Sequence, residues 1–172
     1  RSGIGGNIDI RDLDTLSLNA SRISAETRTG TAGSLTITAA DQIFLDNGSQ
    51  LSVEARPLGS GNQANASSAL VSLRNGNTGG VAGDLTLTTP EVIVRSGSSV
   101  TVSSPAGQAG NLEITANLIQ LENGSSLTAV TGDSGRSAGA NIILNDVELL
   151  LLRDNSLISA EALNRANGGN IT

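Results

Sequence analysis

The sequence repeats a short phrase at nearly constant intervals, and this repetition limits the possible folds more than any other feature. A glycine stands before each step of the type Asn-Ile, Asn-Leu, Ser-Leu or Asp-Leu, and successive glycines lie 27, 50, 27, 29 and 30 residues apart. Such a period is typical of solenoids, propellers and other repeat arrays. The marker glycines are Gly6, Gly33, Gly83, Gly110, Gly139 and Gly169.

Within each unit the apolar residues alternate with polar ones, which indicates strands with one buried face. Three such strands are expected per unit. The first strands carry the pairs Ile8/Ile10, Leu35/Ile37, Leu85/Leu87, Leu112/Ile114 and Ile142/Leu144. The second carry Leu16/Leu18, Ile43/Leu45, Val92/Val94, Ile119/Leu121 and Leu150/Leu152. The third carry Ile23/Ala25, Leu51/Val53, Val100/Val102, Leu127/Ala129 and Ile158/Ala160.

A single unit cannot be stable alone, so the units must stack. About six inward side chains contribute roughly 1.5–3 kcal/mol each, while ordering the backbone costs roughly 1–2 kcal/mol per residue. Parallel pairing of each strand with its equivalent in the next unit satisfies the backbone and stacks the aliphatic side chains. The sequence therefore predicts an all-β fold: a parallel β-helix, or β-solenoid, of about five coils of ~27–30 residues with three short strands each, rising ~4.8 Å per coil. Residues 1–172 are expected to form one such segment, interior to a longer array.

The phrase "NGSSLTA" at 123–129 has near-copies in "NGSQLSV", "SGSSVTV" and "DNSLISA". The parity that points Leu127 inward also points the preceding serine inward, and the turn pair before it suits a sharp, left-handed corner. A ladder of serines is therefore expected, in which each hydroxyl bonds to the backbone of the turn or of the next coil. Its members are Ser21, Ser49, Ser98, Ser125 and Ser156.

The motifs "GGNIDI", "AGSLTIT", "AGDLTLT", "AGNLEIT", "DNGSQLSV" and "ENGSSLTA" span essentially the whole chain. With few aromatic residues and no cysteine, the chain resembles the repeat region of filamentous haemagglutinin-like exoproteins, the large adhesins of two-partner secretion systems. This resemblance implies a right-handed β-helix, export through an outer-membrane transporter, and a role as a stalk or adhesin at the bacterial cell surface.

The composition makes several functions unexpected. Without cysteine or histidine the chain lacks thiol nucleophiles, imidazole ligands and serine–histidine pairs. A net charge of −6 repels nucleic acid, and no apolar run is long enough to span a membrane. Sugar-cleaving enzymes related to pectate lyase share the β-helix, but Asp9, Asp84 and Glu113 are expected on different coils. We therefore expect no enzyme activity, no cofactor and no metal, with such a carbohydrate-active enzyme as the alternative.

The longest interval between marker glycines holds an inserted loop at about 56–80, polar and glycine-rich around one apolar segment. Loops that project from a solenoid often bind partners. Phe44 and Ile93 share an outward lane with Ser17, Gln120 and Leu151, and the loop is the nearest cover for them. The alternative is a small contact patch for a partner or a sister filament. The patch would comprise Phe44, Ile93, Leu70, Val71 and Leu73.

Taken together, these features predict a structural or adhesive segment of a secreted or surface-displayed bacterial filament. It would act as a rigid spacer with possible contact to surfaces or cells. The expected partners are the outer-membrane transporter during secretion, a glycan or protein receptor, and further copies of the chain. A homotypic filament-assembly segment is a further alternative, because "GGNIT" at 168–172 starts another unit.

Overall fold

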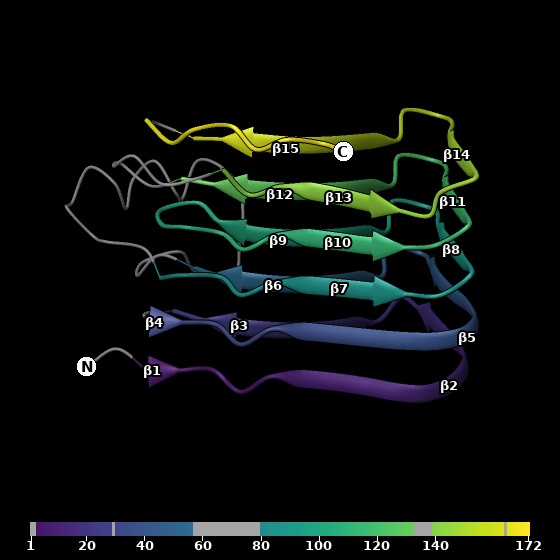
Figure 1. Cartoon of the computed structure of the whole chain (residues 1–172), viewed down its shortest axis with the longest axis horizontal. Helices are drawn as coiled ribbons and strands as arrows, with labels where there is room; N and C mark the ends of the chain where they lie inside the picture. The colour runs from purple at the N-terminus through teal and green to yellow at the C-terminus, as the bar shows by residue number, and fades with distance from the viewer. Residues whose placement is uncertain (1–2, 29, 57–79, 133–138, 164) are drawn as a thin grey trace.

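The computed structural model describes residues 3–28, 30–56, 80–132, 139–163 and 165–172. In these ranges every regular element is a β-strand, and the strands wind into about five coils stacked from the N-terminus to the C-terminus (Figure 1). The chain runs along the front of the stack, turns at the right-hand edge and returns along the back while it rises, which is a right-handed path (Figure 1). The expected parallel β-solenoid is thus confirmed.

Three stacks of parallel strands form the three sides of the solenoid. First strands of the later coils are β7 (Leu85–Thr88), β10 (Leu112–Thr115) and β13 (Ile142–Asn145). Second strands are β8 (Glu91–Val94), β11 (Leu118–Leu121) and β14 (Leu149–Leu152). Third strands are β3 (Arg22–Thr27), β6 (Gln50–Ala55), β9 (Ser99–Ser104), β12 (Ser126–Thr131) and β15 (Leu157–Ala162).

The first two coils depart from the expected three short strands. Their first and second strands are continuous, as β2 (Ile8–Asn19) and β5 (Leu35–Asp46). Because β5 pairs with both β7 and β8, the first and second strands form one sheet. In coil three Pro90 stands at this bend, and proline cannot donate to the strand ladder, so β7 and β8 are separate there. A short pair, β1 (Gly3–Ile4) with β4 (Gly30–Thr31), adds a third small sheet.

Outside a local irregularity around Leu13, where β2 shifts register against β5, the register between coils follows the repeat residue for residue. Leu112 of β10 pairs with Leu85 below and Ile142 above, and Leu127 of β12 pairs with Val100 and Ile158. Identical or similar aliphatic side chains therefore stack along the axis. This stacking gives each coil the cover that a single unit lacks.

The core is a continuous aliphatic shaft. The inward residues of coils two to four, such as Leu35, Ile119 and Leu127, are fully buried in one cluster. Most inward residues of the outermost coils are only partly covered, although Ile142, which pairs with Ile171, is fully buried. Leu150, for example, points inward but remains 41% exposed.

The marker glycines lie where successive coils approach most closely. A side chain on Gly83 would place its Cβ 2.8 Å from the carbonyl oxygen of Gly33 in the coil below. On Gly110, a Cβ would lie 2.5 Å from the carbonyl oxygen of Gly83. Because only glycine has no Cβ, only glycine allows the backbones to come this close. The repeat therefore has a glycine at this corner of each coil.

A ladder of polar side chains, here called the polar ladder, runs beside these glycines. Each side-chain oxygen accepts a hydrogen bond from the backbone N–H of the equivalent residue one coil later, for example 2.7 Å from Asp84 Oδ1 to Asn111 N and 3.1 Å from Asn111 Oδ1 to Asn141 N. These bonds fix the coil-to-coil register at the corner. The polar ladder comprises Asn7, Ser34, Asp84, Asn111, Asn141 and Asn170.

Candidate interaction surface

The most distinctive outer surface of the solenoid is the side formed by the second strands. Its outward side chains stand in three columns across coils two to five, because the parallel register aligns equivalent residues. We call this surface the contact face. It consists of Gln42, Phe44 and Asp46 of β5, Glu91 and Ile93 of β8 with Arg95, Leu118 and Gln120 of β11 with Glu122, and Leu149 and Leu151 of β14 with Arg153.

The contact face is far more apolar than the other two sides. Among outward residues of the described coils, the first-strand side carries one large apolar residue, Ile143, and the third-strand side carries Val130 and Leu157. The contact face carries five. Because its charged residues lie along the edges, the apolar residues form a band across the middle and upper coils. They are Phe44, Ile93, Leu118, Leu149 and Leu151.

Phe44 and Ile93 are direct neighbours in the register of β5 and β8, and both are half-buried. The guanidinium of Arg95 lies over the Phe44 ring, 4.5 Å from its centroid. This cation–π contact bends the arginine across the face and covers part of the ring. Both Phe44 and Ile93 keep part of their surface exposed.

A column of alternating charge borders the contact face. From coil two to coil five it reads Asp46, Arg95, Glu122 and Arg153. Arg95 Nη2 lies 3.1 Å from Asp46 Oδ2, and Arg153 Nη1 lies 3.5 Å from Glu122 Oε1. The two arginines are more exposed than the acids, so positive groups project from the column. We call it the charge column.

The environment of Asp46 lowers the pKa of its carboxyl below the ordinary value. The Ser96 hydroxyl hydrogen-bonds to the carboxylate, while partial burial acts in the opposite direction; Arg95 and the backbone N–H of Asn47 add further stabilisation of the charged form. Asp46 is therefore ionised under all but strongly acidic conditions. The charge column keeps its alternation at neutral pH.

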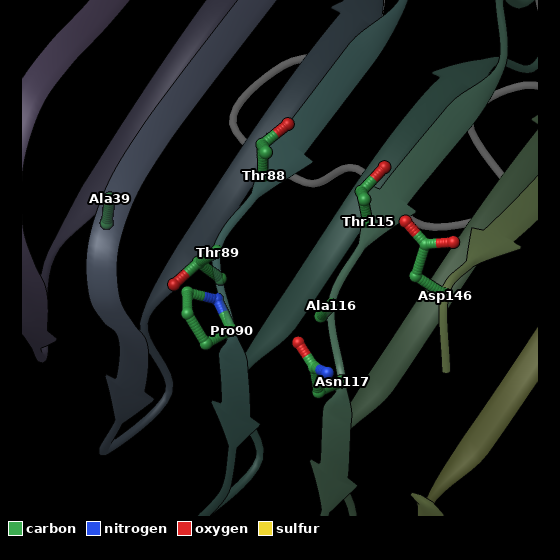
Figure 2. Close-up of a pocket in the computed structure, with 8 residues that line it drawn as sticks. All are labelled: Ala39, Thr88, Thr89, Pro90, Thr115, Ala116, Asn117 and Asp146. Atoms are coloured by element: carbon green, nitrogen blue, oxygen red, sulfur yellow. The ribbon is translucent and has the colours of Figure 1, made fainter. Parts of the chain in front are cut away.

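A second feature is a hollow of about 220 Å³ at the corner between the first and second strands (Figure 2). Coils three and four have one residue fewer at this bend than coils two and five, so their corner is recessed between its neighbours. In Figure 2, Thr88 and Thr115 occupy equivalent positions on adjacent strands, with Pro90 and Asn117 beyond them. The hollow follows from a difference in corner length.

The hollow is lined by small and polar groups. Thr88, Thr115, Asn117 and Asp146 supply polar atoms, and alanine methyls with the Pro90 ring supply apolar surface. Asp146 is the one carboxylate among the lining residues of the described chain, so the hollow presents no pair of acids for glycoside hydrolysis.

The serine ladder lies at the corner between the second and third strands. Ser49, Ser98 and Ser125 are fully buried. Ser49 Oγ donates to Asp46 O at 2.6 Å and accepts from the backbone N–H of Ser21 at 3.2 Å. Ser21, in the outermost coil, is exposed, and the Ser156 hydroxyl is buried without a hydrogen-bond partner in the described chain.

The turn pairs before these serines adopt left-handed backbone conformations, as the turn residues predicted. Asn47 and Gly48 have φ angles of 55° and 71°, and the equivalent pairs of the later coils have similar values. The serine and its turn therefore form one structural unit that repeats with the corner. The unit sets the chain direction at this corner of each coil.

The remaining candidate residues are placed apart. Asp9 and Glu113 share the outward lane of the first strands but lie three coils from each other, and Asp84 belongs to the polar ladder. Among the described residues, no three His, Cys, Asp or Glu side chains gather in a way that could hold a metal ion. Leu70, Val71, Leu73 and the rest of 57–79 lie outside the described residues, so the cover expected for Phe44 stays a prediction.

Sequence reasoning missed three parts of this surface. Leu118 and Leu149 could have been found by parity, because each precedes an inward residue by one position. The polar ladder has a signal too, since a residue with a side-chain oxygen follows the marker glycine in almost every unit. The corner hollow could be seen only once the coils were aligned.

The fold and its surfaces define a parallel β-solenoid protein with one apolar outer face. No family model, curated protein or solved structure matches the chain. Within the described ranges, no helix has the length and apolar character needed to cross a membrane.

Proposed function

We propose that this chain is a rigid spacer segment of a secreted or surface-displayed bacterial filament, with the contact face as its means of touching other molecules. The observation that carries the proposal is the continuous parallel pairing from β2 and β3 to β14 and β15, interrupted only by the irregularity around Leu13 of β2 within the described chain. A rod whose coils all pair in parallel resists bending, because bending must break many backbone bonds at once. The exoprotein-like motifs support the assignment to the cell surface and to an outer-membrane transporter.

Duplicating one coil tests the spacer role. A second copy of residues 84–110 inserted after Gly110 should be accepted, because its corner glycine, polar-ladder residue and inward residues repeat those of its neighbours. We expect the rod to lengthen by about 4.8 Å, seen in small-angle X-ray scattering, with an unchanged β-sheet circular dichroism spectrum. Loss of folding on duplication would contradict a modular spacer.

Antibody labelling tests the location. An antibody raised against this chain should label intact cells of the source organism or detect the protein in the culture medium. Detection only after the cells are lysed would contradict the surface assignment.

A further inference from the structure

We propose that the contact face pairs with the contact face of a second copy of this chain, with the two solenoid axes antiparallel. The proposal rests on three observations: the apolar band, the alternating charge column, and their position on the same side of the rod. The proposal deepens the proposed function by naming a partner for the contact face. The use of this pairing in a filament rests on the proposed function, but the pairing itself does not. The spacer role stands even if copies do not pair.

The apolar band gives the reason for association. Among the outward residues of the three strand sides, the large apolar side chains are most numerous on the contact face, and an apolar patch bordered by charged residues can mark an interaction site. Ile93 and Leu118 lie on adjacent strands near the middle of the face. A second copy brings a surface of the same shape and composition, as a two-fold symmetric contact requires.

The charge column selects the orientation. Consider an antiparallel pair whose two-fold axis passes between coils three and four. The charge column of one copy then faces the charge column of the other copy, with the coils in reverse order. Arg95 then lies opposite Glu122 of the other copy, and Asp46 lies opposite Arg153. Each meeting joins opposite charges and occurs twice by symmetry. Complementary charges of this kind fix the register and orientation of an interface more than its affinity.

Other arrangements of the same faces are worse. Moving the two-fold axis onto coil three would place Arg95 against its own copy and Asp46 against Glu122. In a parallel pair, Arg95 would face Glu91, but Glu122 and Arg153 would face the leucines at the opposite edge of the partner's face, which removes water from these two charges without giving them a partner. Only the axis between coils three and four satisfies the whole column.

The area of the face predicts that the association is weak. Four strands at ~4.8 Å spacing and about four residues of ~3.3 Å give a patch of roughly 250–300 Å² per copy, well below the ~800 Å² of a stable interface. One pair should associate detectably only near millimolar protein. Several such segments along one filament would add their contributions.

Disulfide capture tests the orientation, because the chain has no cysteine and each introduced thiol is unique. In the antiparallel pair Gln42 faces Leu149 of the other copy, so Gln42→Cys mixed with Leu149→Cys should form a mixed disulfide. Leu151→Cys alone reports a parallel pair, in which it would face itself. In the antiparallel pair its copies lie three coils apart, beyond the ~7 Å limit for a disulfide.

A matched control uses the same two coils on another side. Thr36→Cys with Ile143→Cys lies on coils two and five of the first-strand side, and it should link only at the background rate. We expect the contact-face mixture to link at least about tenfold faster than this control, as a specific encounter requires. Equal rates for the two mixtures, or rapid linking of Leu151→Cys with itself, would overturn the proposal.

A second pair of variants separates the contact face from end-to-end stacking. In the Gln42→Cys and Leu149→Cys mixture, adding Ile93→Thr should slow linking about fivefold through lost apolar contact. Adding Ile143→Thr, the same change on the first-strand side, should leave the rate unchanged. An unchanged rate with Ile93→Thr overturns the proposal, whereas the coil-duplication result stands or falls separately.

Discussion

The hydroxyl oxygen of Ser98 accepts a hydrogen bond of 3.1 Å from the backbone N–H of Ser49, although 49 residues separate the two serines in sequence. Each serves the same corner of its own coil, and both are fully buried. A side chain at this position therefore stabilises two coils at once. Changes at the serine ladder should weaken the stack as a whole.

Replacing Ser125 by Lys should strongly destabilise the protein. Ser125 is fully buried and its Oγ donates to Glu122 O at 2.6 Å, so a lysine would place an unpaired charge at a closed corner. The free energy of unfolding should fall by about 3–5 kcal/mol, measured by chemical denaturation. The neighbouring Ser126→Lys points outward and should change it by less than about 0.5 kcal/mol. Equal effects of the two changes would exclude an inward serine.

Removing one acceptor of the polar ladder should release one backbone N–H. Asp84→Ala leaves the N–H of Asn111 without its 2.7 Å partner and should cost about 1 kcal/mol. Asp84→Asn keeps an oxygen at the same place and should retain most of the stability. Hydrogen exchange at the Asn111 amide should be fast in the alanine variant and slow in the asparagine variant. If both variants exchange alike, the side-chain acceptor does not protect this amide.

A methyl group on a marker glycine should matter only where another coil lies beneath it. Gly33→Ala would press its Cβ against the backbone of Gly6 and Asn7, whereas a Cβ on Gly6 meets no atom within 4 Å. Gly33→Ala should lower stability by about 1–3 kcal/mol, and Gly6→Ala should be tolerated. Thermal denaturation of the two variants provides the comparison. Matching melting temperatures would contradict the close approach of the coils.

Acid should weaken the charge column through Asp46. Its pKa is lowered in the folded protein, so its contribution to stability is present above the unfolded pKa of about 3.9 and is lost as the pH falls through the folded pKa. Asp46→Asn should therefore be less stable than the natural chain at pH 7, and the difference should shrink in strong acid. Denaturation curves at both pH values measure it. A difference that is independent of pH would show that the carboxylate charge is not involved.

The sequence was sufficient to predict the stack because its main signal is local. Alternation around Leu112, Ile119 and Leu127 determines which side chains point inward, and the repeat determines which residues pair. The joining of the first two strands in β5 was not predictable in this way. It depends on whether residues 39–41 stay extended, which the alternation of the flanking strands does not specify.

The outer surface was less predictable than the core. Phe44 and Ile93 were identified by their shared outward lane, but the extent of the apolar band required the neighbouring columns that include Leu118. The charge column depends on residues such as Arg95 and Glu122 that follow the strands, where their pairing is a matter of side-chain conformation. A repeat pattern specifies which residues are neighbours in adjacent coils. It does not specify which groups the long, flexible side chains contact.

Every bond of the polar ladder points the same way, with the acceptor on the earlier coil and the donating N–H on the later one. When the chain winds with its N-terminus first, each new coil therefore finds the polar-ladder acceptor of the coil below already in place. Each added coil needs contacts only about one repeat away, so winding is a series of short steps with no long search. Backward slippage must first break a completed coil. For this ladder, the growing end of the stack always presents acceptors to the coil that follows, so folding can proceed along the chain from its N-terminal end.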